Sequence, residues 1–473
     1  MRARRTPVLV SVALLLAAGG VADRAQRPRA TLPASVASRA VMPTAAPGSA
    51  LSSSWFCVGA TAGEGSGADG VVHVANPTER AASGTVTVVP LAGQPVASPV
   101  QVAPMSVTQV ALRDLVQAPW AAAVVDLDIG QVAAELVVRG PSDSDATPCS
   151  SRASDRWHFA DGATAKDAGL ALSLFNPFPE DAIVDLSFST DQGRAAPAAF
   201  RPIVVPARSL VVREIGDHVR RREAISTEVA VRTGRVVAAQ TQTRAAAGKA
   251  GVSVSVGAPS LGTLWQFSAG VLADGVDEHY SVSNPGDREA TLLFQLILDE
   301  GVAEDFERTV PARGRLDVVI NEEVGVPRGV HHSLTVESLD GEPVVVSRAL
   351  GYVPPAGGPG RADTIGLRRS ANRWLFTTAG PSEGDGEWLF VANTGATVAR
   401  ISVTGLDAGT ALAVEGLQDK EVGPGRRAAF LVNEHVTRAA LPLVVRSTSP
   451  VTVERGYYLA TGGIWVGPGI PLD

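Results

Sequence analysis

Acidic side chains recur in a glycine-rich loop that the sequence repeats four times, about 105 residues apart. Carboxylate oxygens on flexible loops are the ligands that Ca²⁺ prefers, and the densest group is Asp274, Asp277 and Glu278. No loop has the ligand spacing of an EF-hand, and Gly and Asp also suit solvated turns that hold no ion. We therefore predict no metal site and no cofactor, and keep these three residues as the candidates for calcium. The loop carboxylates are Glu64, Asp69, Asp161, Asp167, Asp274, Asp277, Glu278, Glu383, Asp385 and Glu387.

The seven histidines form no catalytic motif. The sequence contains neither His-Glu-x-x-His nor the Gly-x-Ser-x-Gly turn of a serine hydrolase. His331 and His332 are adjacent, but neighbours on a strand point to opposite faces. His73 stands between two inward-facing valines and is therefore expected to face outward. We predict that the protein is not an enzyme, and a site assembled across domains is the alternative.

Four tryptophans open the four repeats, each followed by a Phe one or two positions later. Exposed indoles could stack on sugars, but identical placement in every repeat is typical of one core Trp per domain. These residues are Trp55, Trp157, Trp265 and Trp374. Trp120, Trp388 and Trp465 do not repeat, so we expect them at the surface.

The two cysteines, Cys57 and Cys149, lie at the beginning and just after the end of the first repeat. In an oxidising compartment such a pair most simply forms a disulfide. Two unrelated buried thiols are the alternative. Zinc binding is disfavoured, because two cysteines without nearby histidines make a poor site.

Every repeat shows the same order of expected elements. A Trp strand and the acidic loop precede a strand with apolar residues at every second position, which is the pattern of a half-buried β-strand. That strand ends at an Asn, followed by Pro in three repeats, and a Val-rich strand closes the unit. About seven strands in about 105 residues match an immunoglobulin-like fold. We predict an all-β protein of four tandem immunoglobulin-like β-sandwiches, covering residues 54–153, 154–261, 262–371 and 372–473.

The N-terminus has the pattern of an export signal. Arg2, Arg4 and Arg5 precede an apolar run from Val8 to Ala22, so residues 1–22 are predicted to be a signal peptide or an uncleaved signal anchor. Residues 23–53 are rich in Pro and Ala and are predicted to be a disordered tether. The formal net charge is −7, and the chain after these basic segments is more acidic still. An acidic body excludes a typical nucleic-acid binder.

The repeat resembles one found in exported bacterial proteins. Its pattern is Trp-x-Phe, a Gly-rich loop, Asn-Pro, Val-Pro-Ala and finally Pro-Val-x-x-Glu-Arg. The first repeat, with the letters WFCVGAT, is similar to an actinobacterial family of secreted or anchored proteins of unknown function. The resemblance covers nearly all of residues 54–473 and implies an architecture and a location, but no chemistry. The closing motif is complete at Glu454-Arg455, half matched at Ser347-Arg348, and replaced by Ala239-Gln240 in the second repeat.

Together these features predict an exported, non-enzymatic protein of the cell envelope that acts as a structural or interaction scaffold through sandwich loops and sheet edges. One alternative is a cell-wall glycan-binding module. Another is an accessory partner of an envelope-building enzyme, held by an N-terminal membrane anchor. The expected partner is an envelope protein or a wall glycan, and the expected location is outside the cell or on the outer face of the cytoplasmic membrane.

Overall fold

The computed structural model describes residues 43–472, apart from 64–66, 142, 246–249, 324, 354–357, 378–385, 437–440 and 460–462. The predicted signal or anchor at residues 1–22 lies outside the described residues, as does most of the predicted tether. The last part of that tether, residues 43–53, makes definite contacts. The Ala45 amide donates to the Pro471 carbonyl (3.1 Å), and the Gln131 amide donates to the Ala46 carbonyl (2.8 Å). Residues from Met42 onward form one compact unit.

The described chain consists of β-strands and short 3₁₀ turns, which confirms the all-β prediction. In the first repeat one sheet has the order β4-β3-β6-β1 and the second has the order β5-β2-β7-β8. A single parallel bridge between Thr61 and Asp69 joins β1 to β2. The elements are β1 (Ser53–Ala62), β2 (Asp69–Asn76), β3 (Ala82–Pro90), β4 (Val96–Val102), β5 (Ser106–Ala111), η1 (Leu112–Asp114), β6 (Ala118–Leu127), β7 (Ala133–Arg139) and β8 (Ser144–Pro148).

The second and third repeats build the same two sheets. Their outer sheets are β12-β11-β15-β9, with β13 also paired to β11, and β18-β23-β20-β21. Their inner sheets are β14-β10-β16-β17 and β22-β19-β24-β25. The second repeat contains β9 (Arg156–Phe159), β10 (Ala168–Asn176), β11 (Ala182–Thr190), β12 (Gly193–Ala195), η2 (Ala198–Phe200), β13 (Ile203–Val205), β14 (Ser209–Glu214), η3 (Ile215–Asp217), β15 (Ile225–Thr233), β16 (Val237–Arg244) and β17 (Gly251–Val256). The third contains β18 (Leu264–Phe267), β19 (Val276–Asn284), β20 (Ala290–Leu298), β21 (Phe306–Val310), β22 (Gly314–Val319), η4 (Ile320–Glu322), β23 (His332–Ser338), β24 (Val345–Tyr352) and β25 (Gly360–Ile365).

In the fourth repeat one long strand, β32, serves both sheets. Its first part pairs with β26 and β28, and its second part pairs with β27 and β33. The elements are β26 (Ala371–Phe376), β27 (Gly386–Asn393), β28 (Ala399–Asp407), β29 (Thr410–Ala413), β30 (Lys420–Val422), β31 (Arg426–Leu431), η5 (Val432–Glu434), β32 (Leu443–Tyr458), β33 (Ile464–Pro468) and β34 (Ile470–Pro471).

Each sandwich core is organised around its repeated tryptophan. All four indoles are buried, and each Nε1 donates to the carbonyl of an equivalent valine, which precedes the closing strand in three repeats and lies within β32 in the fourth. The bonds are Trp55 to Val132 (3.1 Å), Trp157 to Val236 (2.8 Å), Trp265 to Val344 (3.0 Å) and Trp374 to Val451 (3.1 Å). An indole that satisfies its N–H in a core cannot serve as an exposed sugar platform. The prediction of one core Trp per repeat is confirmed.

The repeated asparagine holds the turn that follows its strand. The amide of Asn176 donates to the carbonyls of Glu180 (2.7 Å) and Val205 (3.1 Å), and its Oδ1 accepts from the Phe178 amide (3.0 Å). The same bonding recurs at Asn76, Asn284 and Asn393. These residues are structural turn residues, as the sequence predicts.

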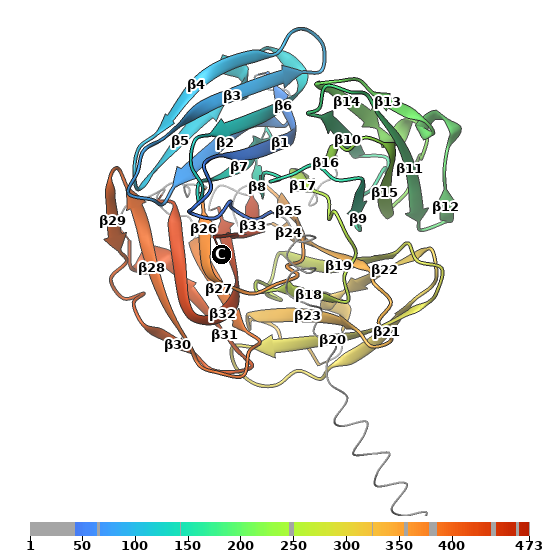
Figure 1. Ribbon diagram of the computed structural model, residues 1–473. Coiled ribbons are helices and arrows are strands. Elements are labelled where there is room, and N and C mark those ends of the chain that lie inside the picture. Colours follow the sequence, from blue (N-terminus) through green and yellow to red (C-terminus); the bar gives the residue numbers. More distant parts are fainter. Residues whose placement is uncertain are drawn as a thin grey trace, which may run out of the picture. The chain divides into compact units, whose positions relative to one another are not determined.

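The last strand of each inner sheet lies at the centre of the unit (Figure 1). β8 contacts β17, β17 contacts β25, β25 contacts β33, and β33 contacts β8, so the four contacts close a cycle. Side chains join each strand to the next. These bonds are Val254 N to Asp145 Oδ2 (2.9 Å), Ser253 Oγ to Asp363 Oδ2, Thr364 Oγ1 to the Val466 carbonyl (2.6 Å) and Trp465 Nε1 to the Ala146 carbonyl (3.0 Å). Trp465 is therefore buried, and the expectation that it lies at the surface is wrong.

The four central strands begin at the same end. A Cβ atom added to Gly360 would approach the Gly463 backbone to 2.2 Å, and one added to Gly251 would lie 2.6 Å from Asp143 Oδ2. We name this the loop end, because the acidic loops also reach the inner sheets there. The opposite end, where strands β2, β10, β19 and β27 finish at their asparagines, is the turn end.

Buried ionic contacts cross between repeats. Arg348 and Glu454, each 1% exposed, pair at 2.9 Å across the third and fourth repeats. Glu454 also accepts a hydrogen bond from the Ala269 amide (2.7 Å). Between the fourth and first repeats, Glu135 accepts from the amide (3.1 Å) and hydroxyl (2.6 Å) of Thr377. The closing Glu of the sequence motif thus binds the neighbouring repeat.

His73 shows the same effect of these interfaces. It faces out of its own sandwich, as the alternation predicts, but it is buried and its environment includes the Thr377 backbone of the fourth repeat. Burial, together with the charge of Arg139, lowers the pKa of His73 to about 4. An outward position on an inner sheet is therefore not a solvent position.

The disulfide between Cys57 and Cys149 is present and closes a separation of 92 residues. In the chain-entropy model, closing so long a loop stabilises the folded state by roughly 4–5 kcal/mol. We predict that replacing both cysteines by serine lowers the free energy of unfolding by about 4 kcal/mol, measured by denaturant titration. In the unaltered protein, a thiol reagent added to unfolded chain without reductant should label neither cysteine. Ready labelling of both would contradict the bond.

The Arg348–Glu454 pair provides a second test. Removing one partner of a buried pair leaves the other charge unpaired, so Glu454→Gln should destabilise the protein by about 3–5 kcal/mol in denaturant titration. The matched control is Glu421→Gln, because Glu421 forms an exposed pair with Arg400. Exposed pairs contribute about 0–1 kcal/mol. Equal effects of the two substitutions would show that the buried pair does not hold the repeats together.

Candidate functional site

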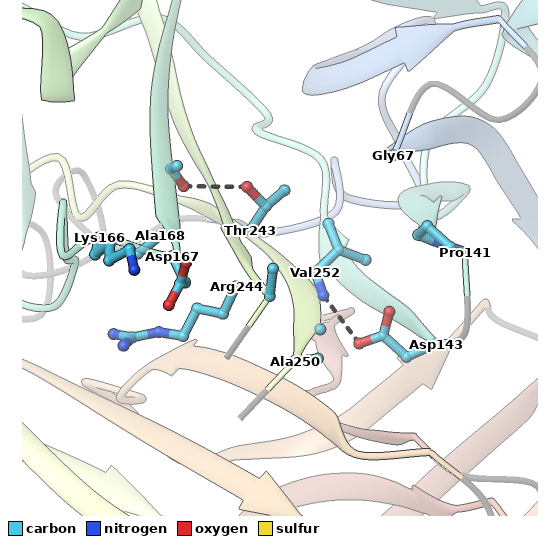
Figure 2. Close-up of a pocket in the computed structure, with 13 residues that line it drawn as sticks. Gly67, Pro141, Asp143, Lys166, Asp167, Ala168, Thr243, Arg244, Ala250 and Val252 are labelled. Atoms are coloured by element: carbon cyan, nitrogen blue, oxygen red, sulfur yellow. Dashed lines mark hydrogen bonds between the residues drawn. The ribbon is translucent and has the colours of Figure 1, made fainter. Parts of the chain in front are cut away.

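A pocket of about 650 Å³ opens at the loop end between the first and second repeats. Its polar lining residues are Asp143, Lys166, Asp167, Thr243 and Arg244. Figure 2 shows Asp143 on one side, beside Val252, and the Lys166, Asp167 and Arg244 side chains on the other. Among the described lining residues none is aromatic, so the pocket offers no ring for sugar stacking.

Three segments build the pocket wall. The turn between β7 and β8 brings Asp143, the β16–β17 hairpin brings Thr243 and Arg244, and the loop before β10 brings Lys166 and Asp167. The hairpin and the loop are joined because the Ala245 amide donates to the Asp167 carbonyl (2.8 Å), and Arg244 pairs with Ala168 across the sheet. These side chains therefore sit on hydrogen-bonded backbone.

Asp143 occupies a special position in the repeat. After each central strand the chain forms a β-bridge with the Trp strand of its own repeat, and this bridge aligns the four repeats. At the position that Asp143 occupies before its bridge, the other repeats have Gly251, Gly360 and Gly463. The Asp143 carboxylate fills the space that these glycines leave. Its Oδ2 accepts from the Val252 amide (2.9 Å) of the second repeat, and the Arg361 amide of the third repeat lies near enough to lower its pKa. Because Gly463 of the fourth repeat packs beside it, Asp143 contacts all three other repeats.

The environment of Asp143 favours its neutral form. Burial raises the pKa of Asp143 to about 6, and the backbone N–H groups of Val252 and Arg361 only partly oppose this shift. Its Oδ1 is buried and has no hydrogen-bond partner among the described residues. Asp145, two residues further along, has a pKa raised well above its usual value by burial and by the nearby Asp363.

A second group of charges lies behind the pocket. Asp161 accepts from Arg361 (2.6 Å) and from Ser281 (3.1 Å), and His279 lies 3.6 Å away. Burial alone would raise the pKa of Asp161, but hydrogen bonding to His279 and the charge of Arg361 hold it well below the usual range. Arg361 also binds Asp363 (2.9 Å). This group is a largely buried network of ion pairs and hydrogen bonds that joins the second and third repeats.

The calcium candidates are not brought together. Asp274 and Asp277 are exposed, whereas Glu278 is completely buried and turned to the other face of β19. Glu278 accepts from the Tyr280 hydroxyl (2.6 Å) and pairs with His332 (3.2 Å). Burial would raise the pKa of Glu278, but the charge of His332 lowers it. Within the part of the chain that the structure describes, no group of three potential ligands is placed to hold a metal ion.

The other loop carboxylates are also separated. Asp69 pairs with Arg113 (3.1 Å), and Glu387 is buried against Arg455. Glu64, Glu383 and Asp385 lie outside the described residues. The acidic residues that recur in the loops therefore have different structural roles and do not form a single shared site.

A smaller cavity of about 360 Å³ lies between the second and third repeats and includes His158 and Glu228. Burial lowers the pKa of His158 to about 4, although the charge of Glu228 opposes this change. The other aromatic candidates do not line either cavity. Trp120 and Trp388 are half-buried, and Trp388 stacks on Phe390.

Sequence reasoning did not select Asp143, Lys166 or Arg244. Neither Asp143 nor Arg244 lies in a recurring motif, and their meeting depends on how the first two repeats contact each other. One signal was present: where the other three repeats have glycine, the first has an aspartate. Another was that Lys166 is one of only three lysines and stands in an acidic loop.

The raised pKa of Asp143 predicts a pH dependence. Its folded pKa, about 6, lies above its ordinary value of 3.8, so its favourable contribution to stability is complete below pH 3.8 and is lost as the pH rises through 6. The loss amounts to about 3 kcal/mol at most. Between pH 4 and 7, Asp143→Asn should therefore gain up to this amount of stability relative to the unaltered protein, measured by denaturant titration. Asp145 is present in both proteins, but the charge of Asp143 raises its pKa, so part of the difference arises through Asp145. A pH-independent difference would contradict the assignment.

Solved structures resemble this chain only weakly. One, the crystal structure of Thermotoga maritima 1070, is 20% identical, with the match covering 23% of this chain and 95% of that chain at a TM-score of 0.21. The alpha-L-rhamnosidase of Streptomyces avermitilis, complexed with L-rhamnose, is 10% identical over 80% of this chain and 54% of that chain, at 0.14. A tetra-tandem repeat in the extending region of a large adhesion protein is 10% identical over 89% and 100%, at 0.11. These scores are too low to support an argument.

No curated protein matches the chain. The model of the Family of unknown function (DUF5719) matches residues 143–415, which is more than half of the sequence. The match begins at Asp143, the residue that joins the four repeats, and it agrees with the resemblance to a family of unknown function. The chain therefore belongs to the family of unknown function DUF5719.

Proposed function

We propose that the protein is an exported, non-enzymatic scaffold of the cell envelope that presents its loop end to an envelope partner. The observation that carries this proposal is the closed cycle of contacts among β8, β17, β25 and β33. Because side-chain hydrogen bonds and buried ion pairs join the repeats, the loops of all four are held at one end. Loops on a rigid scaffold are common contact sites in proteins.

The location rests on two supports. A disulfide is typical of proteins that fold in an oxidising compartment, and Cys57 and Cys149 form one. The basic, apolar N-terminal sequence and the resemblance to secreted or anchored actinobacterial proteins point the same way. Within the described residues, no helix is long and apolar enough to cross a membrane. Whether residues 1–22 are cleaved or retained as an anchor decides between a secreted protein and an accessory partner of an envelope enzyme.

The chemistry of the interior favours a non-enzymatic role. His332 and Glu278 are both fully buried, and Arg348 is paired with Glu454, so these groups have no access to a substrate. The glycan-binding alternative is less well supported. The repeated tryptophans lie in the cores, and the aromatic side chains that sugars stack on do not line the described pocket.

The proposal predicts contacts from one end only. A photo-crosslinking residue would replace Asp167 or Asp274, which are exposed at the loop end. The matched controls are Glu180 and Asp287, exposed at the turn ends of the same two repeats. In cells that make the full chain, we expect crosslinks to an envelope protein from the loop-end positions, at least about fivefold more than from the controls. Quantitative immunoblotting and mass spectrometry of the envelope fraction would measure this ratio.

Equal crosslinking from both ends, or none from either, would overturn the proposal. Crosslinks from the loop end to wall saccharide instead of protein would support the glycan-binding alternative. The disulfide gives an internal check on location, because chain recovered from the envelope fraction should have both cysteines oxidised.

A further inference from the structure

We propose that the pocket between the first two repeats binds an oxyanion, namely the carboxylate or phosphate group of a small ligand, through Arg244 and Lys166. This site goes beyond the scaffold role and does not depend on it. The argument rests on the cations that line the pocket and on the absence of ion pairs between them and other described residues.

Arg244 is the main cation of the pocket. It ends strand β16, and its half-buried side chain lies in the pocket wall (Figure 2). Among the described residues it has no ion pair, and its Nε is buried without a hydrogen-bond partner. Asp161 and Asp363 act on it only through their charge, and each is already bonded to Arg361. A guanidinium carries five N–H donors in a planar fork that matches an oxyanion.

Lys166 adds a second positive charge from a different segment. It is exposed in the loop before β10, lines the same pocket, and forms no ion pair with another described residue. Thr243 lines the pocket as well, but its hydroxyl donates to the Gly169 carbonyl (3.4 Å), and as the strand neighbour of Arg244 it faces the other side of the sheet. Asp167 also lines the pocket and partly offsets the charge of Lys166, so Arg244 makes the main contact and Lys166 adds attraction.

Asp143 bounds the opposite side of the pocket (Figure 2). A Cβ at Gly251 would lie 2.6 Å from Asp143 Oδ2, and Gly251 pairs with Arg244, so glycine leaves room between the two charged side chains. The Asp143 carboxylate repels an anion, so the oxyanion is expected on the Arg244 side of the pocket.

The arrangement does not recur in the third repeat. The position equivalent to Arg244 there is Tyr352, which pairs with Val276 and Gly360 as Arg244 pairs with Ala168 and Gly251. The Tyr352 ring packs edge-on against Tyr458, with ring centres 5.7 Å apart. Where the second repeat has an unpaired cation, the third has an aromatic contact between repeats.

The test is calorimetric titration of the full chain at low salt. Inorganic phosphate and acetate distinguish the two kinds of oxyanion. We expect saturable binding of at least one anion, weakened about tenfold by Arg244→Gln and severalfold by Lys166→Gln. The matched control, Lys420→Gln, removes an exposed lysine of the fourth repeat and should bind like the unaltered protein. Asp143→Asn, which removes the negative charge opposite Arg244, should not weaken binding.

Several results would overturn the site. These are no saturable binding of any probe, or equal binding by the Arg244→Gln and Lys166→Gln variants and the unaltered protein. If Arg244→Gln lowers the thermal midpoint of unfolding, its binding result reflects folding, and the Arg244→Lys and Lys166→Gln variants are used in its place. Loss of binding in Lys166→Gln alone supports the site. Because the titration needs no partner protein, its failure would leave the scaffold proposal intact.

Discussion

The packing of the four repeats depends on one carboxylate at the centre of the loop end. Three repeats place a glycine there, and the first places Asp143. Three glycines leave a space between closely approaching backbones, and a single side chain can enter it. The Asp143 carboxylate accepts the Val252 N–H of the second repeat, lies near the Arg361 N–H of the third, and packs against Gly463 of the fourth. Four aspartates would bring four like charges together, and four glycines would leave those N–H groups without this acceptor.

Burial makes this junction a compromise. A carboxylate taken out of water loses its hydration, and the raised pKa of Asp143 measures that cost. The other interfaces solve the same problem with full pairing, as at Arg348 and Glu454 or Asp161 and Arg361. Buried pairs add little net stability over apolar packing, but they tolerate few alternative arrangements, which is consistent with a fixed order of the repeats. The same bonds hide outward-facing side chains such as His73 from solvent.

Much of the fold could be predicted because it is determined by residues that contact each other within a single repeat. The tryptophans, the turn asparagines and the cysteine pair act within one sandwich, and all three predictions are confirmed. The contacts between sandwiches could not be predicted, since no periodicity within a repeat says which repeats touch. Trp465 was therefore expected at the surface and is buried, and the loop carboxylates were grouped by sequence although the structure separates Glu278 from Asp274. The pocket residues come from two repeats and were missed for the same reason.

Differences between repeats locate the candidate site better than their similarities do. Residues shared by all four serve the cores and turns, because every sandwich needs them. Asp143, Arg244 and Lys166 are each confined to one repeat, and all three line the same pocket. Asp143 lines the pocket and also accepts from Val252 at the junction, so an anion bound at Arg244 would act on a group that binds the second repeat. A nearby negative charge disfavours the ionised carboxylate, which is the form that best accepts that amide. Occupation of the pocket and this hydrogen bond would therefore oppose each other.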